Sequence, residues 1–171
     1  MEAIAANQAL EVCIQTAHDA GSPADQVERF LSAGYIPTPH QWDFHALARQ
    51  ADNWPVEWGQ PEIGLGGTRA SAKTHAAIGQ TFLDDCQRVD GLKCLFLRLT
   101  AKAAAESFQD VLSKVLAHVK HTLNTEKVVM ANGSHAIIGG YANESDIDKY
   151  LGLEYDLINI EEGTQLKGEK I

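Results

Sequence analysis

A short glycine-rich run that ends in Lys-Thr contains the residues of this sequence that are best suited to bind phosphate. Residues 63–74 read Ile-Gly-Leu-Gly-Gly-Thr-Arg-Ala-Ser-Ala-Lys-Thr, and residues typical of a helix follow. Glycines let several backbone N–H groups point at one anion, and the following helix presents its positive end there. In the motif G-x-x-x-x-G-K-[ST], Lys73 would reach the β- and γ-phosphates of a nucleotide, and the Thr74 hydroxyl would bind Mg²⁺. The run predicts a phosphate-binding loop between a strand and a helix.

One position of this run departs from the motif. Gly67 stands at the first glycine, but Ala72 stands at the second. We expect Ala72 to have helix-like torsions just before the helix, where a residue other than glycine is tolerated. An ordinary glycine-rich turn that caps a helix is the alternative interpretation of the same residues.

A pair of acidic residues follows an apolar run near the end of the sequence. Residues 155–160 predict a buried strand, and Glu161 and Glu162 come directly after it. Ligands bind at the carboxyl ends of the strands in open α/β sheets, so this pair would lie near the phosphate loop. Glu161 would bind Mg²⁺ directly or through water, and Glu162 would deprotonate the attacking water. A solvated acidic turn is the alternative, but the loop and the strand-end acids together favour a nucleotide site.

Further polar and aromatic residues are candidates for the same site. Arg69 lies inside the loop and would stabilise charge on the γ-phosphate of its own chain or of a neighbouring subunit; a solvated arginine is the alternative. Arg98 ends a predicted strand, and the same two interpretations apply to it. Gln41 begins a predicted helix, and its amide both donates and accepts, as an adenine edge requires; a solvated glutamine is the alternative. The two tryptophans of residues 54–58 would stack on a base or, as is commoner, cover an edge of the core.

The composition restricts the class of protein. The 171 residues allow one domain with a real core, with or without a helical extension. The net charge of −9 excludes a general polyanion binder, so any nucleic acid would contact a local patch or parts beyond this sequence. Three isolated cysteines are typical of a reducing cytoplasm and do not favour a zinc site. We expect neither a signal peptide nor a membrane span.

Hydrophobic periodicity predicts helices that alternate with apolar strands. Helices are expected over residues 1–20, from residue 22 onward, and over 40–52, 73–88, 100–123 and 145–151. Strands are expected before the loop and over residues 92–98, 127–130, 135–138 and 155–160, with a hairpin turn at Asn132-Gly133. This order predicts a mostly parallel α/β sheet flanked by helices, with an N-terminal helical extension at residues 1–34 and a nucleotide-binding domain at 35–171.

Taken together, these motifs resemble the N-terminal ATPase domain of the large subunit of tailed-bacteriophage terminases, the DNA-packaging motors. The resemblance covers about residues 35–166. It rests on residues 35–41 (YIPTPHQ), 66–74 (GGTRASAKT), 97–100 (LRLT) and 150–162 (YLGLEYDLINIEE). The last block is the most specific, because Tyr-Leu-Gly lies before the predicted strand and Glu-Glu-Gly-Thr-Gln begins directly after it.

The resemblance implies an additional-strand P-loop NTPase fold that hydrolyses ATP with Mg²⁺. It implies Gln41 as the adenine contact, Glu161 as the Walker B acid and Glu162 as the catalytic glutamate. The implied Walker A loop consists of Gly67, Thr68, Arg69, Ala70, Ser71, Ala72, Lys73 and Thr74. Two residues depart from the family pattern: Ala72 replaces a glycine, and Glu161 stands where many P-loop enzymes have Asp.

The resemblance also implies partners and a location. These are double-stranded DNA, the portal protein, the terminase small subunit and a homo-oligomeric ring on the procapsid, in the host cytoplasm and without a membrane. Family members continue beyond the acid pair with more strands and a nuclease domain, so we expect a truncated ATPase domain, incomplete at its C-terminus, that binds ATP weakly and turns over little. Another P-loop DNA-dependent ATPase, such as a helicase-like enzyme, and a non-catalytic remnant or adaptor remain alternatives.

Overall fold

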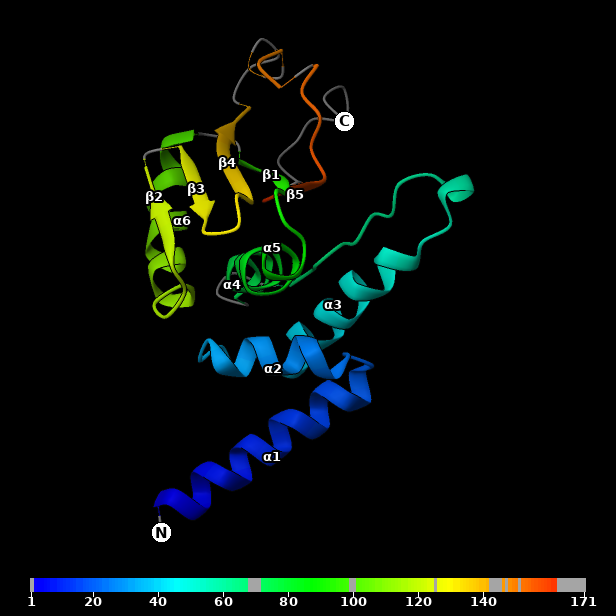
Figure 1. The fold of residues 1–171 in the computed structure, drawn as a ribbon, viewed down its shortest axis with the longest axis vertical. Coiled ribbons are helices and arrows are strands. Elements are labelled where there is room, and N and C mark those ends of the chain that lie inside the picture. Colours follow the sequence, from blue (N-terminus) through cyan, green and yellow to red (C-terminus); the bar gives the residue numbers. More distant parts are fainter. Residues whose placement is uncertain are drawn as a thin grey trace.

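The chain forms an α/β fold in which helices pack on a five-stranded sheet (Figure 1). This computed structural model describes residues 2–67, 72–98, 101–124, 126–141, 146, 148–150 and 152–162, and only the backbone of residues 2–6 and 101–107. The strands are β1 (Lys93–Arg98), β2 (His121–Leu123), β3 (Lys127–Met130), β4 (His135–Gly140) and β5 (Leu157–Ile160). Their order in the sheet is β2-β3-β4-β1-β5.

The sheet is mostly parallel, as predicted. Strands β4, β1 and β5 are parallel, and Leu95 in the middle of β1 lies opposite Ile137 and Ile158 of its two neighbours. Strands β3 and β2 extend the sheet in antiparallel pairs. The centre of β1 is buried, which agrees with the continuous apolar sequence of a strand covered on both faces. Strand β5 is the edge of the described sheet, and its Ile158 and Ile160 are exposed, so the prediction that the strand at residues 155–160 is buried is wrong.

Two helical segments cover one face of β1. The first runs without a break through α4 (Lys73–Ile78), the π-helix η3 (Gly79–Asp85) and α5 (Cys86–Arg88), which confirms the helix predicted after the loop. The second is α6 (Ala101–Val115). The ring of Phe96 in β1 stacks on Phe82 of η3 at 5.9 Å between centroids and meets Phe108 of α6 edge-on at 4.8 Å. These three rings lie at the centre of the core.

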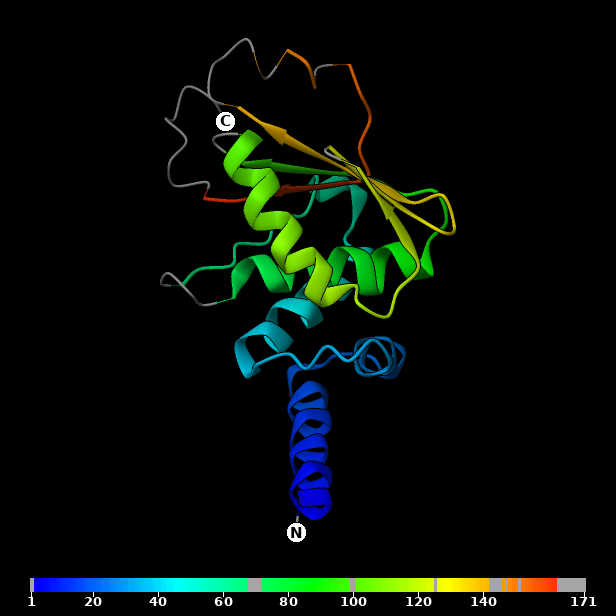
Figure 2. The ribbon, with the colours of Figure 1, turned by 90° about the vertical axis from the view of Figure 1, so that its left-hand side faces the viewer.

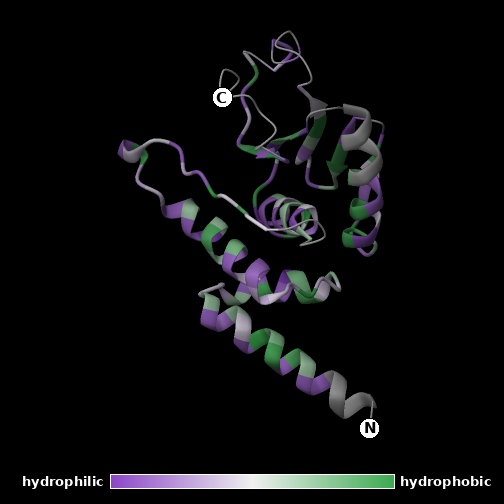
Figure 3. Ribbon diagram, turned by 180° about the vertical axis from the view of Figure 1, so that it is seen from behind, coloured by the Kyte–Doolittle hydropathy of each residue, from purple (hydrophilic) through white to green (hydrophobic). Residues whose placement is uncertain are grey.

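The N-terminal helices form a third layer. They are α1 (Glu2–Ala20), α2 (Ala24–Ser32) and α3 (Pro39–Gln50), close to the predicted ranges. Phe30 of α2 and Trp42 of α3 are fully buried, with centroids 5.6 Å apart, and belong to the same core as the sheet residues. Helix α1 points away from the sheet (Figure 2), and hydrophobic residues remain visible along it (Figure 3).

Several predicted elements differ in the structure. Residues 61–67 form no strand; three glycines in seven positions disfavour one. The helix predicted to end at Leu123 ends at Val115, because His121–Leu123 pair with β3 as strand β2, a tertiary contact that helical periodicity does not show. Of the short helix predicted at residues 145–151, residues 148–150 form a turn, and residues 145, 147 and 151 lie outside the described residues.

Candidate functional site

The two ends of the predicted phosphate loop lie close together. Lys73 is the first residue of α4, and its Nζ donates a hydrogen bond to the carbonyl oxygen of Gly67 at 3.0 Å. Thr74, the next residue, is half-buried. Thr68, Arg69, Ala70 and Ser71, which complete the loop, lie outside the described residues. The lysine and the threonine are therefore at the start of the helix, as a phosphate-binding loop requires.

The backbone of Ala72 differs from the prediction. Its φ of 54° and ψ of 32° are left-handed, not helix-like. A β-carbon makes this conformation cost roughly 1 kcal/mol, which explains why a glycine is expected at this position of the motif. Ala72 therefore keeps the backbone path of a glycine at an energetic cost, and our expectation that alanine is tolerated without strain is wrong.

Gln41 joins the loop to α3 through both ends of its buried amide. Its Oε1 accepts from the backbone N–H of Thr38 at 2.8 Å, which forms a capping box at the start of the helix. Its Nε2 donates to the carbonyl oxygen of Ala72 at 3.0 Å. The side chain thus positions the residue that precedes Lys73. The adenine contact stays a prediction, and one Nε2 hydrogen and one lone pair of Oε1 are left to make it.

The acid pair lies at the carboxyl end of β5, beside the end of β1. Because these strands are parallel, Arg98 of β1 reaches both acids: its Nη2 is 3.0 Å from Oε1 of Glu162, and its Nη1 is 3.8 Å from Oε2 of Glu161. The backbone N–H of Glu161 continues the strand pairing with a 2.8 Å bond to the carbonyl of Leu97. Glu162 has a φ of 54°, so the chain turns sharply there. The predicted acids and Arg98 therefore form one cluster.

A tyrosine that the sequence analysis missed completes this cluster. The hydroxyl of Tyr141, just after β4, donates to the carbonyl oxygen of Glu161 at 3.2 Å. Burial raises the pKa of Tyr141, both glutamates raise it further and Arg98 opposes them. Tyr141 follows a strand, like the two acids, and this position is the signal that would have identified it.

The two halves of the predicted site lie on the same side of the molecule. Figure 2 shows that α4 begins on the side toward which the carboxyl ends of β1 and β5 point. Within the described residues, no group of three or more His, Cys, Asp or Glu side chains is arranged to bind a metal. Mg²⁺ at a nucleotide site needs few protein ligands, because phosphates and waters supply the rest. Thr74 and Glu161 stay the residues predicted for this role.

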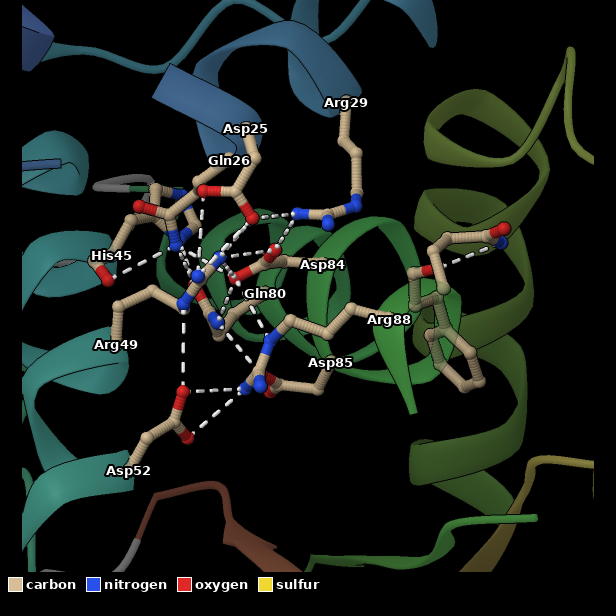
Figure 4. Close-up of polar contacts among 12 residues, drawn as sticks. Asp25, Gln26, Arg29, His45, Arg49, Asp52, Gln80, Asp84, Asp85 and Arg88 are labelled. Carbon is tan, nitrogen blue, oxygen red and sulfur yellow. Dashed lines mark hydrogen bonds and ion pairs between the residues drawn. The ribbon is translucent and has the colours of Figure 1, made fainter. Parts of the chain in front are cut away.

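A second polar cluster, which the sequence analysis did not predict, lies between the N-terminal helices and η3 (Figure 4). At its centre is Asp84, whose side chain is fully buried. Asp84 accepts hydrogen bonds from Nη1 of Arg29 at 2.9 Å and from Nη1 of Arg49 at 3.0 Å. We call it the Asp84 network; its members are Asp25, Gln26, Arg29, His45, Arg49, Asp52, Gln80, Asp84, Asp85 and Arg88.

Burial changes the protonation of two members of this network. It lowers the pKa of His45 to about 4, although Gln80 and Asp84 act in the opposite direction. It also raises the pKa of Asp85 to about 6, with a contribution from Asp84, while Gln80 and Arg88 oppose the shift. His45 is therefore a neutral ring at pH 7, bonded to Gln80 at 2.8 Å and to the hydroxyl of Tyr35 at 3.1 Å. The network fastens α2 and α3 to the helix that begins at the phosphate loop.

The tryptophans between α3 and the loop do not cover the core. Trp54 and Trp58 are 43% and 68% exposed, so the commoner use that the sequence analysis named is wrong for this chain. Their segment carries the short helices η1 (Ala51–Asn53) and η2 (Val56–Trp58). Stacking on a base stays a prediction.

Comparison with known proteins adds no relative. No protein-family model, curated protein or solved structure matches the chain. Within the described residues, no helix has the length and apolar character needed to traverse a bilayer. The site is therefore characterised by its own geometry: a lysine at a helix start, two strand-end acids and an arginine between them.

Proposed function

We propose that this chain is a P-loop ATPase that binds Mg-ATP between the start of α4 and the carboxyl end of β5. The observation that carries the proposal is the paired placement of Lys73, on a loop closed onto Gly67, and of Glu161 and Glu162 at the end of a parallel strand. A lysine and helix N–H groups bind phosphate oxygens, and strand-end acids bind the metal and the water. Neither the lysine at the loop nor the strand-end acids alone indicate an ATPase, but their combination does.

In the proposed reaction, each residue has one role. Lys73 would bind the β- and γ-phosphates as a point charge, and Thr74 and Glu161 would complete the shell of Mg²⁺, which neutralises phosphate charge when bound. Glu162 would accept the proton of the attacking water. The ion pair with Arg98 keeps the Glu162 carboxylate in one position before nucleotide binds. Arg69 would act on the γ-phosphate, as the resemblance implies.

The finer assignment follows from the resemblance to terminase large subunits. We propose that ATP hydrolysis by this chain belongs to a motor that moves double-stranded DNA into a procapsid, with the portal protein, the small subunit and other copies of the chain as partners, in the host cytoplasm. The order of the motifs from residue 35 to residue 166 supports this assignment. The acidic net charge agrees with DNA contacts made mainly by other parts of such a motor.

Phosphate release from Mg-ATP tests the proposal, with Glu162→Gln as the variant and Glu154→Gln, an exposed glutamate outside the cluster, as the matched control. We expect slow release by the native chain and by the control, and none above background by Glu162→Gln, although it still binds ATP. Equal rates in all three proteins would contradict the role of Glu162. Faster release in the presence of double-stranded DNA, but not of single-stranded DNA, would support the motor over a helicase-like enzyme.

A further inference from the structure

The segment between α3 and α4 extends away from the body of the protein. In Figure 1 it leaves the end of α3 as an arm, with η2 at its tip, and returns to the start of α4. We call residues 51–63 the tryptophan arm. Its most exposed large apolar side chains are Val56 at 89% and Trp58 at 68%, and Trp54 lies beside them. The apolar side chains therefore gather at the part of the arm that is farthest from the sheet.

The tip has a defined conformation. Trp54 and Trp58 meet edge-to-face, with centroids 5.5 Å apart and planes at 82°. Their backbone N–H groups close two short turns, to the carbonyls of Ala51 and Pro55, each at 3.0 Å. At its base, Asp52 pairs with Arg88 at 3.0 Å, which connects the arm to the Asp84 network. A preorganised aromatic tip loses little conformational entropy when it binds a partner, and tryptophan is enriched among residues that dominate binding.

The charges of the arm select the kind of partner. Residues 51–63 contain Asp52, Glu57 and Glu62 and no lysine or arginine. Glu57 and Glu62 are exposed and form no ion pair with the other described residues. Phosphate groups of a nucleic acid would be repelled by this arrangement, because binding them requires basic side chains. The same segment of a second copy would also be repelled, because it has the same three acidic residues.

We propose that the tryptophan arm is a docking element for a partner protein whose apolar surface is bordered by lysines or arginines. Trp58, Trp54 and Val56 bury against the apolar surface, and Glu57 and Glu62 pair with the basic border. Such charge complementarity favours the correct partner and raises the association rate. The inference does not depend on the proposed ATPase activity, because it uses no residue of the nucleotide site.

Fluorescence anisotropy with defined probes tests this proposal. The probe is a fluorescein-labelled 14-residue amphipathic helix of leucine and lysine, and its charge-inverted counterpart contains leucine and glutamate. We expect saturable binding of the basic peptide only. Trp58→Ala should raise its Kd at least about tenfold, the loss typical of a residue that dominates an interface. Glu57→Gln combined with Glu62→Gln should raise it about threefold and weaken its salt dependence.

Matched controls separate the arm from the general acidity of the chain. Val12→Ala removes an equally exposed apolar side chain from α1, and Glu11→Gln with Glu28→Gln removes two exposed charges elsewhere. We expect both to keep the native Kd within twofold. An unchanged Kd for Trp58→Ala, no binding of the basic peptide, or equal binding of both peptides would overturn the proposal. Binding of a 20-residue oligothymidylate by the native chain but not by Trp58→Ala would overturn the proposal in favour of a nucleic-acid partner. A dimer of the native chain that dissociates in Trp58→Ala would overturn it in favour of a second copy.

Discussion

The two polar clusters of this protein differ in burial and in the number of their connections. The centre of the Asp84 network is buried, with Asp25 and Asp52 at its exposed rim, and its ten side chains come from α2, α3, η1 and the η3–α5 helix. The acid pair after β5 is partly exposed, and among the described residues its carboxylates pair with Arg98 while Tyr141 bonds the backbone carbonyl of Glu161. A buried network in which each charge has partners serves to fix the fold, whereas a half-open cluster with few partners can exchange them for a ligand. The contrast indicates which cluster is structural and which is available for chemistry.

The largest expected effect comes from the centre of the buried network. Asp84→Ala removes the buried carboxylate that Arg29 and Arg49 share and leaves them only the exposed carboxylate of Asp25 to share, so we expect the free energy of unfolding to fall by about 3–5 kcal/mol. Urea denaturation measures this change. Asp110→Ala, which breaks the exposed ion pair with Lys114, is the control and should cost less than about 1 kcal/mol. Similar losses of stability in both variants would show that the Asp84 network stabilises the fold no more than an exposed ion pair does, and would contradict its structural role.

The network also predicts opposite pH dependences from two of its members. In the folded chain the pKa of His45 is lowered to about 4, so between pH 6.5 and 4 the unfolded chain binds a proton at this residue and the folded chain does not. The free energy of unfolding therefore falls by about 3 kcal/mol as pH drops from about 6.5 to 4. Asp85 has a raised pKa of about 6, so the folded chain binds the proton first, and stability rises as pH drops from about 6 to 3.8. The two slopes oppose each other in the native protein.

Substitution separates the two slopes. In Asp85→Asn, the free energy of unfolding should fall as pH drops from 6.5 to 4, and in His45→Gln it should rise between pH 6 and 4. Denaturation at a series of pH values in one buffer system measures both. The same slope in both variants would show that neither residue titrates as its burial implies.

A smaller effect is expected at the end of the phosphate loop. Ala72→Gly removes the β-carbon from a left-handed residue and should raise the free energy of unfolding by about 0.5–1 kcal/mol. Ala48→Gly, in the interior of α3, provides the opposite control and should lower it by about 1 kcal/mol. Thermal denaturation of both variants gives the signs. A loss of stability in Ala72→Gly would show that the loop has a different conformation in solution.

The smallest effect on stability is expected at the acid pair. Glu162→Gln removes the ion pair with Arg98, but both side chains are partly exposed, so the free energy of unfolding should change by less than about 1 kcal/mol. Urea denaturation checks this value beside the loss of ATP hydrolysis proposed above. A large destabilisation would assign the acid pair to the fold, like the Asp84 network.

Local patterns predicted the elements whose sequence alone determines them. The apolar run that forms β1 and the hairpin around Asn132-Gly133 depend on burial and turn chemistry between near neighbours, and both are present. The acid pair and Arg98 were predicted from their positions after strands, and parallel pairing brings them together. The bond from Lys73 to Gly67 likewise follows from residues six positions apart.

Contacts between distant segments were not predictable in the same way. The Asp84 network joins residues as far apart as Gln26 and Asp84, and their polar character is typical of solvated helix faces. The left-handed Ala72 and the short β2 depend on neighbours that periodicity does not reveal. Covering an edge of the core is the commoner of the two uses that the sequence offers for the tryptophan arm, whereas its acidic residues agree with the observed exposure.

Calorimetric titration with Mg-ATP tests the central claim most directly, namely that the loop around Lys73 binds nucleotide phosphate. The proteins are the native chain, Lys73→Ala, and Lys114→Ala as the control for loss of a helical lysine. We predict one weak site in the native chain and in Lys114→Ala, with at least about tenfold lower affinity in Lys73→Ala. Equal affinities in all three proteins, or no binding by the native chain, would contradict the account.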